Sequence, residues 1–69
     1  MAEIISKPKV HHGHNLKVIR ETRGHKQDSI AHIIGCSQPY IAKLESTAAI
    51  AEDTLRQFAE IYRVDIDLL

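Results

Sequence analysis

The sequence predicts a small all-α fold, a compact bundle of four to five helices in a chain of 69 residues. Three observations indicate this class. Apolar residues recur at helical spacing in several segments, glycines or capping residues separate those segments, and no segment has a convincing strand pattern. Because 69 residues lie near the lower size limit for a single hydrophobic core, we expect one folded domain.

The chain divides into an arm and a domain. Residues 1–12 show no helical period and contain Pro8, so we predict a flexible or extended N-terminal arm. Residues 13–69 are predicted to form the folded domain. Its helices are expected at about 13–23, 26–34, 38–45 and from residue 52 onward, with a final short turn near residues 65–67.

The most specific pattern lies between residues 26 and 45. A short amphipathic helix ends at Gly35, which suits a left-handed C-terminal cap. Ser37 is a good N-cap for the next helix, and Pro39 falls in its first turn, where a missing N–H costs nothing. Two short helices joined by such a tight turn form a helix-turn-helix, a unit that places its second helix in the DNA major groove.

Charge is distributed unevenly although it sums to zero. Residues 1–43 hold seven Lys or Arg against three acidic residues, a balance of +4. Residues 44–69 hold two Arg against six acidic residues, a balance of −4. A basic half can face phosphates while an acidic half faces solvent or a partner.

Composition excludes several classes. The single cysteine, Cys36, cannot form an internal disulfide, and no apolar run approaches the roughly 20 residues of a membrane span. The N-terminus lacks the apolar segment of a signal peptide. We therefore expect a cytoplasmic protein that does not contact membranes.

A set of positions extends the pattern beyond the two-helix unit and resembles a known superfamily. These residues are Gly24, Lys26, Gln27, Ala31, Gly35, Ser37, Ile41, Leu44, Glu45, Leu55, Phe58, Ala59 and Val64. Over about residues 13–69 the chain resembles the Cro and phage-repressor superfamily, the XRE-type transcriptional regulators with a lambda-repressor-like DNA-binding domain. The resemblance implies a five-helix, sequence-specific binder of double-stranded DNA, usually a dimer on a near-palindromic operator, in the bacterial cytoplasm and associated with the nucleoid.

The resemblance also implies DNA-contacting residues in the second and third helices. Gln27 would hold a phosphate and brace the recognition helix at about residues 38–45, and Gln38 would bond adenine N6 and N7. Lys43, further along the outward side, would reach a guanine edge or a phosphate. Tyr40 would contact a thymine methyl or a phosphate, or else pack on Pro39, which offers no side-chain hydrogen bond. Each of these residues could instead be an ordinary solvated side chain.

Further residues are assigned to support or phosphate contacts. The resemblance implies a structural ion pair between Arg20 and Glu45, with phosphate binding by Arg20 as the alternative. The aliphatic position occupied by His25 suggests a half-buried ring. Phosphate contacts are expected from the N-cap and loop residues and from two lysines, namely Ser37, Ser46, Thr47, Lys17 and Lys26.

Neither a metal site nor catalysis is expected. The His11-His12-Gly13-His14 cluster has no Cys or carboxylate at a recognised metal-ligand spacing. No nucleophile–base set or glycine-rich phosphate loop stands out, so we expect a non-enzyme without a cofactor.

The function predicted is therefore that of a helix-turn-helix transcriptional regulator, a repressor acting as a homodimer. Two alternatives remain open: the antitoxin of a toxin–antitoxin pair, and a protein-interaction module that has lost base reading. The dimer is expected to use apolar residues that the core does not need, around the C-terminal end: Val18, Ile33, Ile61 and Leu68. The arm would either add phosphate contacts or pack on a second subunit.

Overall fold

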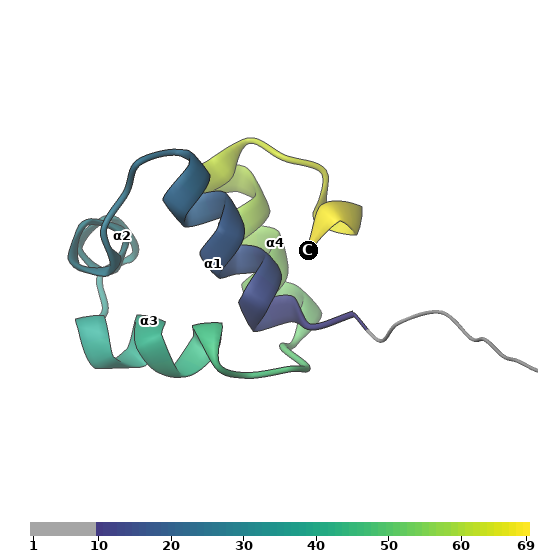
Figure 1. Cartoon of the computed structure of the whole chain (residues 1–69), viewed down its shortest axis with the longest axis horizontal. Helices are drawn as coiled ribbons and strands as arrows, with labels where there is room; N and C mark the ends of the chain where they lie inside the picture. The colour runs from purple at the N-terminus through teal and green to yellow at the C-terminus, as the bar shows by residue number, and fades with distance from the viewer. Residues whose placement is uncertain (1–9) are drawn as a thin grey trace, which may run out of the picture.

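The computed structural model describes residues 10–69, which form four α-helices and one short 3₁₀ helix. These are α1 (His12–Thr22), α2 (Gln27–Ile34), α3 (Gln38–Glu45), α4 (Glu52–Tyr62) and η1 (Ile66–Leu68). Figure 1 shows α1 and α4 packed together at the centre, with α2 and α3 on one side and η1 on the other. Every regular element in this part of the chain is helical, which confirms the predicted all-α fold.

The N-terminal boundary differs slightly from the prediction. Helix α1 begins at His12, one residue before the predicted start of the domain, so the last residue of the predicted arm is helical. Exposed Val10 and half-buried His11 precede it without regular structure. The rest of the predicted arm, residues 1–9, lies outside the described residues.

The α2–α3 turn forms as the sequence predicts. Gly35 ends α2 in the left-handed conformation, with φ of 87°, which a side chain would strain. Its N–H donates to Ala31 O at 2.8 Å, and the N–H of Cys36 donates to the same carbonyl at 2.9 Å. Ser37 Oγ then accepts from Tyr40 N at 3.3 Å, which caps α3. The turn therefore fixes the direction in which α3 leaves α2.

A single hydrophobic core joins all five elements. Ile30 of α2, Leu16 of α1 and Ile41 of α3 are almost completely buried. They pack with the other buried apolar residues of α2, α3, α4 and the flanking segments, which are Ala31, Leu44, Ile50, Leu55, Phe58, Ala59, Tyr62 and Leu69. Burying side chains of this size contributes about 1.5–3 kcal/mol each relative to exposure. The two helices of the predicted motif are thus held from behind by α1 and α4.

Gly13 allows α1 to contact the end of α3. A Cβ atom at this position would lie 2.3 Å from Leu44 O and 2.7 Å from the carbonyl carbon of Glu45. No real side chain tolerates such distances, so this glycine is required by close backbone approach rather than by its own dihedral angles. The α3 carbonyls consequently lie directly against the first turn of α1.

Hydrogen bonds join the first turn of α1 to the α3–α4 loop. The N–H groups of His12 and Gly13 donate to Ala48 O and Thr47 O, each at 2.9 Å. A further hydrogen bond runs in the opposite direction: the N–H of Ile50 in the loop donates to His12 Nδ1 at 2.9 Å. Helix N-termini usually leave such groups for water or ligands. In α1, carbonyl oxygens of the loop after α3 accept these hydrogen bonds instead.

Candidate nucleic-acid interface

Helix α3 has one face in the core and one face in solvent. Ile41 and Leu44 point inward, whereas Pro39, Tyr40 and Lys43 are exposed. This is the arrangement that a helix needs to enter a DNA groove while it stays anchored to the domain.

Gln38 and Lys43 flank this outward face rather than sharing one side of it. Residues advance about 100° around an α-helix, so positions five apart lie about 140° apart. Gln38 is half-buried next to α2, while Lys43 is exposed at the other edge. The expectation that both lie on one side is therefore wrong, although both remain on the accessible part of α3.

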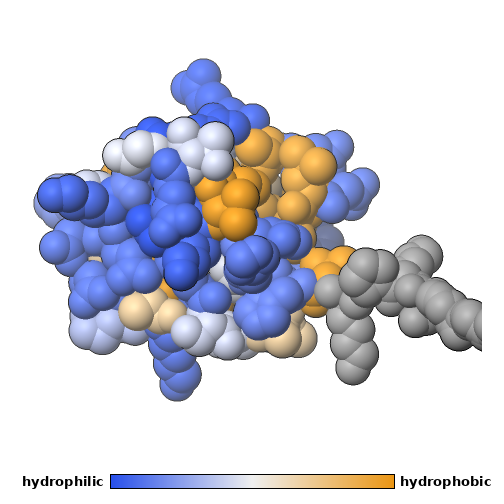
Figure 2. Space-filling view, in the orientation of Figure 1, coloured by the Kyte–Doolittle hydropathy of each residue, from blue (hydrophilic) through white to orange (hydrophobic). Residues whose placement is uncertain are grey.

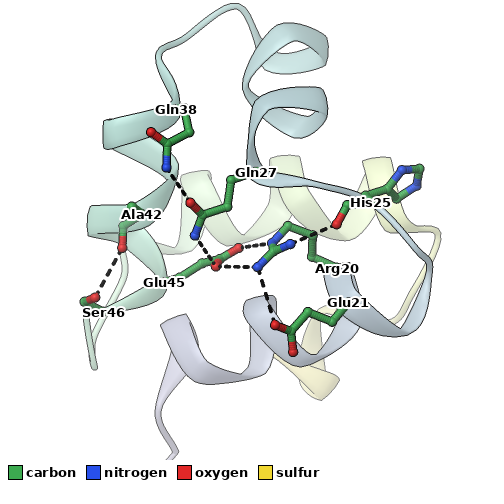
Figure 3. Close-up of polar contacts among 8 residues, drawn as sticks. All are labelled: Arg20, Glu21, His25, Gln27, Gln38, Ala42, Glu45 and Ser46. Carbon is green, nitrogen blue, oxygen red and sulfur yellow. Dashed lines mark hydrogen bonds and ion pairs between the residues drawn. The ribbon is translucent and has the colours of Figure 1, made fainter.

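A chain of polar contacts connects Gln38 to the interior (Figure 3). Gln38 Nε2 donates to Gln27 Oε1 at 2.5 Å, and Gln27 Nε2 donates to Glu45 Oε1 at 2.9 Å. The first and last residues of α3 are thereby bridged by the first residue of α2. Spacing in the sequence gave no sign of these side-chain contacts, because the partners are 11 and 18 residues apart on different helices.

Arg20 and Glu45 form the ion pair that the resemblance implied. Arg20 Nε lies 2.6 Å from Glu45 Oε2, and Nη2 lies 3.1 Å from Oε1, so the two groups meet in a fork. Both residues are buried, at 7% and 8% exposure. The hydrogen bond to Glu45 raises the pKa of Arg20, and desolvation opposes this effect. Such burial does not suit the alternative in which Arg20 binds phosphate.

The His25 carbonyl, not its ring, completes this site. Arg20 Nη1 donates to His25 O at 2.8 Å, and the residue as a whole is exposed. The prediction of a half-buried His25 ring is therefore wrong. The turn that follows α1 turns its backbone toward Arg20 and leaves the imidazole in solvent.

Tyr62 lies behind the ion pair with its hydroxyl unsatisfied. Its Oη is buried and has no hydrogen-bond partner among the described residues. Desolvation, and secondly the negative charge of Glu45, raises the pKa of Tyr62 to about 12, while Arg20 acts in the opposite direction. The phenol is therefore held neutral next to a buried charged pair.

The N-terminus of α2 is the open end of the site. Within residues 10–69, no side chain caps this helix; its N-cap residue is Lys26, which is exposed. A polar hollow adjoins it, lined by Arg20, Lys26, Gln27, Asp28 and Gln38. Backbone N–H groups, the helix dipole and a lysine together favour a phosphate here, although Asp28 opposes it.

The loop after α3 uses its donors internally. Ser46 Oγ donates to Ala42 O at 3.2 Å, and Thr47 Oγ1 donates to Lys43 O at 2.7 Å. Their N–H groups donate to carbonyls of α3 at 3.1 and 2.9 Å. A phosphate contact from either residue would require one of these bonds to break, so their predicted role has no support in the geometry. Lys17 is exposed on α1, one turn beyond Gly13.

The histidine cluster supports the backbone. His11 Nδ1 accepts from His14 N at 2.9 Å and so caps α1, while His12 Nδ1 accepts from the loop. In the described part of the chain, no three His, Cys, Asp or Glu residues lie together as metal ligands. None of the helices in residues 10–69 is long and apolar enough to span a bilayer.

An apolar groove lies at the opposite end of the molecule from this site. Val18 is 45% exposed and Leu68 62% exposed, and both line a groove with Ile19 and Val64. Figure 2 shows that apolar surface lies exposed among largely hydrophilic surface on the face drawn there. Of the other residues predicted at a dimer interface, Ile33 is 57% exposed on α2, whereas Ile61 packs against the core.

These features define a helix-turn-helix: two short helices across a glycine turn, with the second anchored by a buried ion pair and exposed along one face. The family model described as "Helix-turn-helix domain" matches residues 11–69, and the chain belongs to that family. Comparisons with curated proteins and with solved structures found no match. Membership confirms the helix-turn-helix prediction and supports DNA as the ligand.

Proposed function

We propose that this protein is a sequence-specific regulator of transcription of the XRE type, a repressor that inserts α3 into the major groove of double-stranded DNA. The observation that carries the proposal is Gln38, an amide held at the accessible N-terminal end of α3 by its bond to Gln27. Because Gln27 uses only one N–H of that amide, its oxygen and second N–H remain available for adenine N7 and N6.

Supporting contacts fall on both sides of Gln38. Exposed Lys26 and the uncapped start of α2 would bind one phosphate, and exposed Lys43 would bind another or a guanine edge. Neither the Pro39 nor the Ala42 side chain has a polar atom that could bind a base. Base reading by α3 would therefore depend on Gln38, with Tyr40 and Lys43 as the other exposed polar side chains that could reach a base. The proposal includes no catalytic step, and the site of action would be the bacterial nucleoid.

The direct test is selection of bound sequences from a random DNA pool, followed by affinity measurements on the selected and scrambled duplexes. Gln38→Ala should weaken specific binding by about 1–3 kcal/mol and relax preference at one base pair. Its effect on scrambled DNA should be small, because phosphate contacts supply non-specific binding. Equal losses on both duplexes would show that Gln38 does not read a base.

The dimeric part of the proposal rests on the apolar groove of Val18, Ile19, Val64 and Leu68. A dimer formed through this end would present two α3 helices about 34 Å apart to a near-palindromic operator. Sedimentation of the wild type and of Leu68→Glu, free and on a palindromic duplex, tests it. The dimer would be excluded if the wild type sediments as a monomer when free and binds the palindromic duplex only as a monomer.

The exposure of Ile33 favours one further candidate, a protein partner such as a toxin. Ile33 lies on α2 and does not line the groove. A dimer formed through the groove would therefore leave it uncovered. A partner that binds with an affinity insensitive to salt, while DNA binding is absent, would favour the interaction module over the regulator.

A further inference from the structure

The N-terminal half of the outward face of α3 is apolar at its centre. The buried residues of this helix are Ile41, Leu44 and Glu45. Since residues advance about 100° around an α-helix, Pro39 lies about 165° from the mean direction of these three. Lys43, one turn further along, lies about 155° from it. Both residues are exposed, so the side chain that points most directly away from the core is a pyrrolidine ring.

The side chain beside Pro39 on the flank nearest α2 is also apolar. Ala42 is half-buried there, three residues after Pro39, and adds a methyl group to the same surface. The polar group on that flank, the Gln38 amide, donates an N–H to Gln27 Oε1 at 2.5 Å. Pro39 has no backbone N–H, and neither Pro39 nor Ala42 has a side-chain hydrogen-bonding atom. A base that meets this part of α3 can therefore be recognised only through an apolar contact.

One chemical group in the major groove suits such a contact. Purine edges present N7 together with O6 or N6, and cytosine presents N4, whereas thymine adds a methyl group on C5. A purine edge covered by a proline ring would lose its water without gaining a hydrogen bond. A methyl group gains free energy from the same burial. Because 5-methylcytosine has its methyl group on the same ring carbon as thymine, the two bases would look alike to Pro39.

We propose that Pro39 reads the 5-methyl group of a pyrimidine, so that DNA binding by this protein responds to cytosine methylation. At the position under Pro39, 5-methylcytosine takes the place of thymine, and unmethylated cytosine does not. This inference rests on the proposed function, since Pro39 meets a base only if α3 enters the major groove. It adds a second read position next to that of Gln38, and a modification of the DNA that strengthens binding.

The first arm of the test changes only the DNA. In the duplex selected from the random pool, each thymine is replaced in turn by deoxyuridine, which removes the methyl group and keeps every hydrogen-bonding atom. We expect one replacement to weaken binding about three- to fivefold, the value of burying one such group. Cytosine and 5-methylcytosine, each paired with guanine, are then compared at that position. The methylated base should bind about three- to fivefold more tightly.

The second arm changes only the protein. Pro39→Ser replaces the ring with a small polar side chain that the first turn of a helix tolerates. Both methyl effects should fall to less than about 1.5-fold in this variant, because the apolar partner that buries the methyl group is gone. Lys43→Ala is the matched control on the same face: it should weaken binding to every duplex and leave both ratios unchanged. Thermal unfolding and affinity for the scrambled duplex verify that Pro39→Ser is folded.

The outcomes separate the two proposals. Methyl effects that are present in wild type and Lys43→Ala and absent in Pro39→Ser support the assignment. Binding that no deoxyuridine weakens, 5-methylcytosine that binds no better than cytosine, or methyl effects that persist in Pro39→Ser would each overturn it while sequence-specific DNA binding stands. A folded wild type that binds the selected and scrambled duplexes equally would overturn the proposed function, and with it the reading of a methyl group.

Discussion

The two ends of α3 are built for different purposes. At its C-terminal end, Leu44 and Glu45 are buried, the loop donates back to the helix, and the first turn of α1 lies against the carbonyls. At its N-terminal end, Ser37 is exposed and Gln38 is only half-buried beside the uncapped start of α2. One end anchors the helix and the other presents polar groups, so the helix can be held rigidly by contacts that do not compete with a ligand.

The largest expected effect on stability comes from adding a side chain at Gly13, where α1 lies directly against the anchored end of α3. Gly13→Ala places a methyl group 2.3 Å from Leu44 O, so α1 and α3 must separate. We expect a loss of about 3 kcal/mol in the free energy of unfolding, at the upper end of overpacking costs. Urea denaturation measures it.

Gly24→Ala is the matched control for Gly13→Ala. A Cβ atom there meets nothing within 4 Å, but φ is 77°, so backbone strain is the whole cost, about 1–2 kcal/mol. Equal losses in the two variants would mean that close approach of α1 to α3 does not govern stability.

The next largest effect on stability is expected at high pH and comes from Tyr62, which is buried beside the Arg20–Glu45 pair. The pKa of Tyr62 is raised to about 12 in the folded state, whereas tyrosine in an unfolded chain has a pKa of about 10. Stability should therefore fall as pH rises from about 10 to 12, by roughly 2–3 kcal/mol in total.

Tyr62→Phe isolates that contribution, because it removes the phenol and changes no other ionisable group. The variant should be at least as stable as wild type at neutral pH, since it removes a buried hydroxyl without a partner. Its advantage should grow above pH 10. Denaturation curves that stay parallel from pH 8 to pH 11.5 would contradict the prediction.

A smaller effect on stability is expected from the N-terminal cap of α1. His11→Ala removes the acceptor for His14 N and should cost about 1 kcal/mol, the usual value for a side-chain cap. His25→Ala should cost much less, because His25 contributes its carbonyl rather than its ring. Thermal unfolding of both variants distinguishes them, and a larger loss for His25→Ala would reverse their roles.

The smallest effect on stability is expected at the presenting end. Lys26→Ala should leave the free energy of unfolding nearly unchanged but weaken binding to all DNA sequences alike. The slope of log affinity against log salt should become shallower by about 0.9 if one phosphate contact is lost. Arg56→Ala, which removes an equal charge from α4, should leave the slope unaltered. Identical slopes for the two variants would show that Lys26 does not contact a DNA phosphate.

Sequence reasoning succeeds where a signal is local. The Gly35 turn and the Ser37 cap depend on neighbouring residues and are present as predicted, and the helix limits agree with the prediction to within one residue. The ion pair between Arg20 and Glu45 was accessible only through resemblance, because the partners are 25 residues apart.

Periodicity alone could not predict which side chains on different helices meet. Periodicity places Gln27 and Gln38 on their own helices but does not say that their amides meet. The predicted phosphate contacts of Ser46 and Thr47 have no support in the geometry for a different, local reason, since their hydroxyls donate to α3 carbonyls four residues earlier. For His25, a positional analogy gave the wrong environment because the backbone, rather than the ring, faces Arg20.

The close packing at Gly13 limits how far the two-helix motif can be treated as a module. Residues 27–45 contain the turn and the presenting amide, yet α3 ends on groups that α1 supplies: a position without a side chain and the guanidinium of Arg20. A transplant of this segment into another scaffold would keep its sequence and lose its anchor. The host would need a glycine where its first helix crosses Leu44, and an arginine two turns further along to pair with Glu45.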